Sequence, residues 1–186
     1  MDKINIMIIG VGGQGTLLAS RVIGSVALKN SFDVKMSEVH GMAQRGGSVV
    51  TNVKLATEVY SPIIEEGEAD IILAFEKLEA LRWIGHLKPD GKMLINNQEI
   101  EPIPVIIGKA EYPEDILKKI NENYNNIITI DALNIAKECG TIKAVNTVMI
   151  GLMAASLDIK KEDWLQSIID IVPDRFKETN IKAFEA

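Results

Sequence analysis

The sequence predicts an α/β fold, a three-layer sandwich with a mostly parallel, Rossmann-like sheet. Apolar runs of strand length alternate along the chain with segments of helical periodicity, which is typical of βαβ units. Most of these runs lack polar alternation, as expected for strands buried on both faces of a parallel sheet. Aromatic residues make up only 5% of the 186 residues, so we expect an aliphatic core. A chain of this length can bury about 70% of its unfolded surface, and we expect residues 1–186 to form a single domain.

The strands are predicted from apolar runs bounded by turn residues. These runs are residues 4–9, 34–36, 49–55, 71–75, 93–95, 105–107 and 127–130. The run at 49–55 differs from the others because it mixes polar with β-branched residues. It is therefore expected to be an edge strand or an antiparallel strand.

The helices are predicted from apolar residues that recur every three or four positions. The expected helices are residues 16–30, 77–87, 113–123, 131–139, 145–157, 160–171 and 175–184. Residues 145–157 are apolar nearly all round the helix, so this segment should be buried, either in the core of this chain or against a partner.

A glycine-rich loop joins the first predicted strand to the first predicted helix. Its residues are Gly10, Gly12, Gly13, Gln14, Gly15 and Thr16, which contain a G-x-G-x-x-G pattern. Between a strand and a helix, this pattern gives a tight turn with free backbone N–H groups and a helix dipole that favours an anion. Two interpretations stay open, namely an anion or nucleotide site and a turn packed on a neighbouring subunit.

A second unusual segment, residues 37–48, lies between two strand-like runs. Its candidate functional residues are Glu38, His40, Arg45, Gly46, Gly47 and Ser48. The two glycines let the backbone approach another molecule closely, and the arginine offers a planar fork of donors for phosphate or carboxylate. The alternative is a tight turn with a solvated arginine.

Glu38 and His40 are the candidate catalytic residues, because an extended chain places both side chains on one side. Histidine suits proton handling or a hydrogen bond to substrate, but it also suits a hydrogen bond that orders a loop. An acidic residue about 20 positions after a glycine loop is also the expected ribose ligand of a dinucleotide site. An NAD(P)-dependent Rossmann dehydrogenase is therefore the alternative enzyme class.

Taken together, the two segments resemble one family. The glycine loop at 10–15 followed by Glu-Val-His-Gly-Met-Ala-Gln-Arg-Gly-Gly at 38–47 is similar to the gamma-type domain of 2-oxoacid:ferredoxin oxidoreductases. Within this family, the extended second segment is most similar to the beta subunits of indolepyruvate ferredoxin oxidoreductase. Further matches are Ala-Val-Asn-Thr-Val-Met-Ile-Gly at 144–151 and Asn-Ile-Lys-Ala-Phe at 180–184, so the resemblance covers nearly the whole chain.

The resemblance implies a small subunit that supports oxidative decarboxylation of aryl pyruvates to aryl-acetyl-coenzyme A, with ferredoxin as the electron acceptor. A larger alpha subunit would carry thiamine diphosphate and iron–sulfur clusters. This chain would bind no cofactor tightly, and coenzyme A phosphates would suit residues 12–15 and Arg45. Asn96-Asn97 follows Asp90-Gly91 too closely for a thiamine motif, so we expect a turn there. The non-enzymatic alternative is an assembly subunit that binds no small molecule.

Several classes of function are not expected from the composition. A net charge of −6 argues against nucleic-acid binding, and two separated histidines show no metal-ligand spacing. The single cysteine, Cys139, cannot hold an iron–sulfur cluster, which usually takes four thiolates. We see no signal peptide and no apolar run long enough to span a membrane, so we expect a cytoplasmic protein. The apolar segment 145–157 and the glycine loops suggest that the isolated chain forms a homodimer.

Overall fold

The computed structural model describes residues 3–41 and 47–186. Its strands are β1 Ile4–Val11, β2 Asp33–His40, β3 Ser48–Ala56, β4 Ala69–Ala74, β5 Leu87–Asn96 and β6 Ile127–Ile130. Its α-helices are α1 Thr16–Lys29, α2 Lys77–Trp83, α3 Ile103–Ile106, α4 Ile116–Asn123, α5 Ala132–Glu138, α6 Val145–Ala154, α7 Lys161–Ile171 and α8 Lys177–Glu185. Short 3-10 helices cover Ile84–His86, Ile142–Ala144 and Asp174–Phe176.

The described strands form one six-stranded sheet in the order β2-β3-β1-β4-β5-β6. The pairs β1–β4, β4–β5 and β5–β6 are parallel, whereas β1–β3 and β2–β3 are antiparallel. The sheet is therefore mixed and mostly parallel. The expectation for residues 49–55 is confirmed in its antiparallel form, but β3 lies inside the sheet rather than at its edge.

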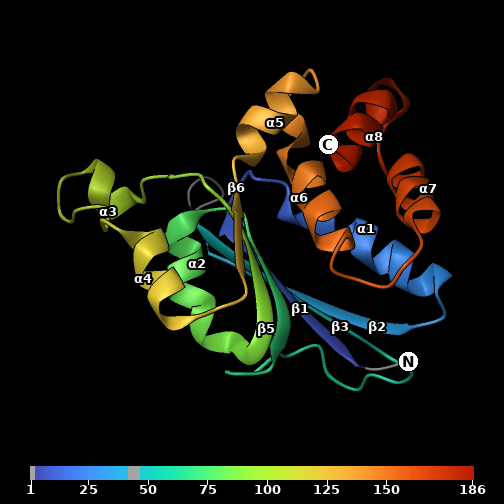
Figure 1. Cartoon of the computed structure of the whole chain (residues 1–186), viewed down its shortest axis with the longest axis horizontal. Helices are drawn as coiled ribbons and strands as arrows, with labels where there is room; N and C mark the ends of the chain where they lie inside the picture. The colour runs from blue at the N-terminus through green and yellow to red at the C-terminus, as the bar shows by residue number, and fades with distance from the viewer. Residues whose placement is uncertain (1–2, 42–46) are drawn as a thin grey trace.

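Helices cover both faces of the sheet, with α1, α6, α7 and α8 on one side and α2 and α4 on the other (Figure 1). The residues of β1 alternate between the two cores. Ile6 and Ile8 pack toward α1 and α6, while Met7 and Ile9 pack toward α2. Both faces of β1 are buried, which explains why its sequence shows no polar alternation.

Helix α6 lies in the core of this chain. Met149, Ile150 and Met153 are completely buried. This helix therefore does not provide the exposed apolar surface on which the homodimer prediction partly rested. Within the described residues, no helix combines the length and apolar character that a membrane span requires.

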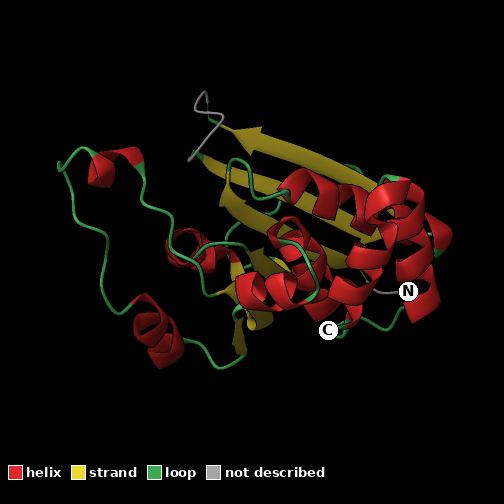
Figure 2. Ribbon diagram, turned by 90° about the horizontal axis from the view of Figure 1, so that it is seen from above, coloured by secondary structure: helices red, strands yellow, loops and turns green. Residues whose placement is uncertain are grey.

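The strand predicted at 105–107 is wrong, because this segment belongs to the short helix α3. Pro102 is the N-cap and Pro104 lies in the first turn, where a missing N–H costs nothing. The helix lies on the long connection between β5 and α4. This connection extends away from the sheet (Figure 2). We call residues 97–115 the arm. Ile103, Ile106 and Ile107 on the arm remain 53%, 66% and 56% exposed.

Candidate functional site

The glycine loop and the end of β2 meet in one cleft of about 400 Å³. The cleft is lined by Gly12, Gly13, Gly15, Thr16, Leu17, Glu38, His40, Gly41 and Val49. The structure thus brings together six of the predicted site residues from the two segments. Arg45 and Gly46, which were predicted to contribute to the same site, lie outside the described residues.

The conformation of the loop requires its glycines. Gly13 and Gly15 have φ values of +101° and +82°, a region that costs other residues about 1–2 kcal/mol. A Cβ atom on Gly15 would also lie 2.6 Å from Nδ2 of Asn146 on α6. Gly12 donates its backbone N–H to the carbonyl of Gly47 at 2.9 Å, which ties the loop to the residue preceding β3.

The N-terminus of α1 opens on this cleft. Leu18 and Ala19 donate their N–H groups to the carbonyl of Gly15, whereas Thr16 and Leu17 begin the helix and have no intrahelical acceptor. These amides and the helix dipole favour an anion at the loop. The local chemistry therefore fits one phosphate group.

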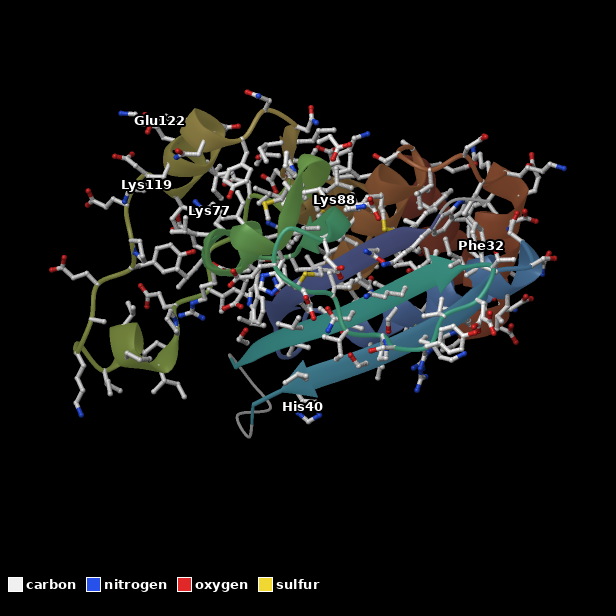
Figure 3. All side chains as sticks on the ribbon, turned by 90° about the horizontal axis from the view of Figure 1, so that it is seen from below. Phe32, His40, Lys77, Lys88, Lys119 and Glu122 are labelled. Atoms are coloured by element: carbon white, nitrogen blue, oxygen red, sulfur yellow. The ribbon has the colours of Figure 1, made fainter. Side chains whose placement is uncertain are left out.

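Glu38 and His40 lie on the same face of the edge strand β2 and line the cleft opposite the loop. Glu38 accepts a hydrogen bond from the hydroxyl of Thr51 on β3 at 3.2 Å. His40 is exposed at the end of β2, and its side chain projects away from the sheet (Figure 3). The described lining contains no lysine or arginine, so a bound phosphate needs a cation from another residue or a partner.

Two of the other predicted ligands, Gly10 and Gln14, face the protein interior. The Gln14 side chain accepts the N–H of Val11 at 2.9 Å and donates to the carbonyl of Phe75 at 2.9 Å. It also donates to Gln98 at 3.2 Å. A Cβ on Gly10 would lie 2.8 Å from Oε1 of Gln14, so this glycine makes room for that brace. The Gln14 side chain therefore braces the ends of β1 and β4.

Ser48 likewise makes an internal contact. Its hydroxyl donates to the Glu79 carboxylate at 2.5 Å, and the same carboxylate pairs with Arg82 at 2.5 Å. Glu79 is only 1% exposed. It fixes the start of β3, where the chain emerges from the 38–47 segment. Glu79 therefore anchors the first residue of β3.

Glu76 is a second buried carboxylate that sequence analysis missed. It is 1% exposed, caps α2 by accepting the N–H of Glu79 at 2.9 Å, and accepts the N–H of Ile100 at 3.2 Å. The hydroxyl of Tyr112 also donates to it. Burial, followed by this hydrogen bond, raises the pKa of Tyr112, so its hydroxyl stays a donor. Glu76 thus holds both ends of the arm. The signal in the sequence that could have identified it is an acidic residue directly after an apolar strand.

The turn expected at Asn96-Asn97 is wrong, because Asn96 is the last residue of β5 and is fully buried. Its amide donates to the carbonyl of Phe75 at 3.1 Å and accepts the N–H of Ala132 at 3.1 Å. Asn96 therefore ties β4 and β5 to the start of α5. Within the described residues, no group of three or more His, Cys, Asp or Glu side chains could hold a metal ion.

Comparison with known proteins places the chain in a family. Residues 5–186 match the family described as pyruvate ferredoxin/flavodoxin oxidoreductase. The chain belongs to this family. Indolepyruvate oxidoreductase subunit IorB of Pyrococcus horikoshii is 40% identical over 190 residues, covering 100% of this chain and 94% of the relative. The same subunit of Methanothermobacter thermautotrophicus is 38% identical, covering 97% of this chain and 93% of the relative.

Solved structures of other proteins share the fold of this chain. The gamma subunit of a keto/oxoacid ferredoxin oxidoreductase from Geobacter sulfurreducens has a TM-score of 0.72 at 24% identity, covering 98% of this chain and 94% of that chain. A 2-oxoglutarate:ferredoxin oxidoreductase from Magnetococcus marinus, solved with 2-oxoglutarate, coenzyme A and succinyl-CoA, has a TM-score of 0.75 at 17% identity. This chain is covered completely and corresponds to 30% of that longer chain.

The dehydrogenase alternative is wrong. A Rossmann unit places the second strand beside the first, with its terminal acid next to the glycine loop. Here the antiparallel strand β3 separates β1 from β2. The family match and the inserted strand together place the chain in the pyruvate ferredoxin/flavodoxin oxidoreductase family rather than among the NAD(P)-dependent Rossmann dehydrogenases.

Proposed function

We propose that this chain is the small subunit of an indolepyruvate ferredoxin oxidoreductase. The observation that carries the proposal is the 38–40% identity to IorB subunits over nearly the whole chain. The reaction would be the oxidative decarboxylation of an aryl pyruvate to an aryl-acetyl-coenzyme A, with ferredoxin accepting the electrons. A larger partner subunit would supply thiamine diphosphate and iron–sulfur clusters, which provide the carbanion and electron-transfer chemistry.

The purified chain alone is expected to show no turnover of indolepyruvate, coenzyme A and a viologen dye. It has one cysteine in the sequence and no metal-binding cluster within its described residues. Co-purification with the large subunit should restore dye reduction, measured spectrophotometrically. Robust turnover by the isolated chain would contradict the subunit assignment.

Within this assignment, the glycine-loop cleft is our candidate site for a coenzyme A phosphate. The amides at the start of α1 favour an anion, while Glu38 across the cleft opposes one. Arg45 is the predicted cation that would offset Glu38. The competing function is an assembly role in which this cleft contacts only protein.

Replacing Gly13 by alanine is expected to weaken coenzyme A binding at least about tenfold, a difference of roughly 1.4 kcal/mol. The new methyl group would project into the cleft, since nothing lies within 4 Å of a Cβ built there. Gly67→Ala is the matched control, because Gly67 also has a positive φ, +72°, and open space, but lies outside the cleft. Both variants should lose similar stability. Calorimetric titration of coenzyme A into the assembled complex measures the difference, and equal affinities would favour the assembly role.

The arm is our candidate contact with the large subunit. Replacing Ile106 and Ile107 by aspartate should weaken assembly at least about tenfold, because each buried isoleucine contributes about 1.5–3 kcal/mol. The fold should remain intact, since both side chains are more than half exposed. Ile142→Asp is the control, as Ile142 is 57% exposed and lies off the arm. Sedimentation velocity measures assembly and also tests the predicted homodimer of the isolated chain. Unchanged assembly of the double variant would remove the arm from the interface.

A further inference from the structure

Strand β2 forms one edge of the sheet, and it is long for an edge strand. It has eight residues, whereas β6 at the opposite edge has four. Among the described residues, β2 pairs only with β3, and no backbone–backbone hydrogen bond outside the sheet involves residues 33–40. Every second residue of an antiparallel strand directs its N–H and C=O groups to the other side. The outer side of β2 thus presents a row of backbone donors and acceptors that a further strand can satisfy.

The side chains beside this edge are apolar and exposed. Met36 and Val39 lie on opposite faces of β2 and are 45% and 64% exposed. Leu17 and Leu28 on α1, the helix beside β2, are 48% and 64% exposed. A groove of about 650 Å³ runs between α1 and β2, and Leu28 and Met36 are among its lining residues. A strand added at this edge would therefore cover apolar surface as well as backbone.

The strand that fits this edge is β2 of a second copy. Two antiparallel copies of one strand are related by a two-fold axis perpendicular to the sheet, so the same edge serves both copies. Opposite side chains share a face of the sheet, so the axis passes through a single residue of β2. An axis at Lys35 or Glu38 would place like charges opposite each other, which destabilises a sheet. Met36 and Ser37 remain as central residues.

The charges at the edge favour Ser37. In the described part of the chain, no ion pair involves Arg21 on α1 or Glu38 on β2. Gly24 packs against Met36, and Leu17 lines the cleft with Glu38, so the exposed Arg21 lies between these two levels of β2. An axis at Ser37 places Glu38 of the second copy opposite Met36, beside Arg21.

We propose that two copies of this chain associate through antiparallel β2 strands, with Ser37 of each copy at the two-fold axis. The two sheets become continuous, the α1 helices lie side by side over the junction, and Arg21 of each copy pairs with Glu38 of the other. Glu38 also lines the glycine-loop cleft, so both clefts lie next to this interface. The arm follows β5, toward the opposite edge of the sheet, and the inference does not rest on the proposed function.

Charge exchange in the full chain tests the interface. Arg21→Glu and Glu38→Arg should each raise the Kd of the dimer at least about tenfold, because each creates two like-charge contacts. An equimolar mixture of the two variants should restore the wild-type Kd within about threefold, because opposite charges then meet at both contacts. Glu122→Arg is the matched control, since Glu122 is exposed on α4 and lies away from β2 (Figure 3). Sedimentation equilibrium measures each Kd. A monomeric wild type at millimolar concentration, or a mixture as weak as the single variants, would overturn the proposal.

Disulfide trapping tests the register, in a Cys139→Ala background that removes the native thiol. Ser37→Cys should give a covalent dimer on oxidation, because opposite Cα atoms lie within the range of about 4.4–6.8 Å that a disulfide spans. Lys35→Cys and Val39→Cys should not cross-link with themselves, since each would lie more than about 10 Å from its own copy. They should cross-link with each other when mixed, because Lys35 lies opposite Val39 of the second copy. Non-reducing electrophoresis reads the products, and any other pattern would overturn the proposed pairing.

Discussion

Replacing Glu76 by alanine is expected to lower the free energy of unfolding by about 2–4 kcal/mol and to release the arm from the sheet. The substitution removes the cap of α2 and leaves the partly buried hydrogen-bond donors of Ile100 and Tyr112 without their acceptor. Urea denaturation measures the stability. Hydrogen exchange at Ile100 reports the arm, and its amide should exchange faster in the variant.

Two further substitutions separate the parts of this effect. Tyr112→Phe removes only the tyrosine hydrogen bond, so it should cost about 1 kcal/mol while the cap of α2 is kept. Glu99→Ala is the matched acidic control, because Glu99 pairs with Lys77 at the surface and its side chain is 57% exposed. It should change stability by less than about 0.5 kcal/mol. If the Glu76→Ala and Glu99→Ala variants had the same free energy of unfolding, Glu76 would not hold the arm to the rest of the fold.

Gly151→Ala is expected to destabilise the chain by about 1–3 kcal/mol, although glycine to alanine within a helix usually stabilises. A Cβ on Gly151 would lie 2.3 Å from the backbone carbonyl oxygen of Phe184 on α8. A backbone atom cannot rotate away, so α6 and α8 would have to separate. Thermal and urea denaturation of the variant measure the loss.

Gly24→Ala in α1 is the matched control. Its new Cβ would meet only the side chain of Met36, with Cε 3.2 Å away. Met36 is flexible and 45% exposed, so it can move aside. Here alanine should stabilise by about 0.5–1 kcal/mol. If both substitutions changed the free energy of unfolding in the same direction, the close approach of α6 and α8 would not decide the result.

The sequence determined the order of strands and helices along most of the chain. Each buried strand appears as a short apolar run and each α-helix except α3 as a periodic segment, since these patterns depend on neighbouring residues alone. It also located the two segments that line the cleft. The glycine loop is a local requirement, because only glycine adopts the positive φ angles at 13 and 15 without strain. The family followed from the exact residues at 38–47.

Local patterns failed where a residue's partner is distant in sequence. The apolar run at 105–107 was predicted as a strand, but no neighbouring strand pairs with it and two prolines favour a helical turn. Asn96 was predicted in a turn, but it is buried because Ala132 and Phe75 supply its hydrogen-bond partners. In both cases, the missing information was which other segment lies beside the residue.

The tertiary structure alone decided which polar residues face the cleft and which brace the fold. Gln14 and Ser48 belong to the two predicted segments, but Phe75 and Glu79 hold their side chains inside the protein. The insertion of β3 between β1 and β2 excluded the dehydrogenase topology. Periodicity and spacing report the local conformation of a chain, whereas burial and hydrogen-bond satisfaction depend on contacts that form only when distant segments pack together.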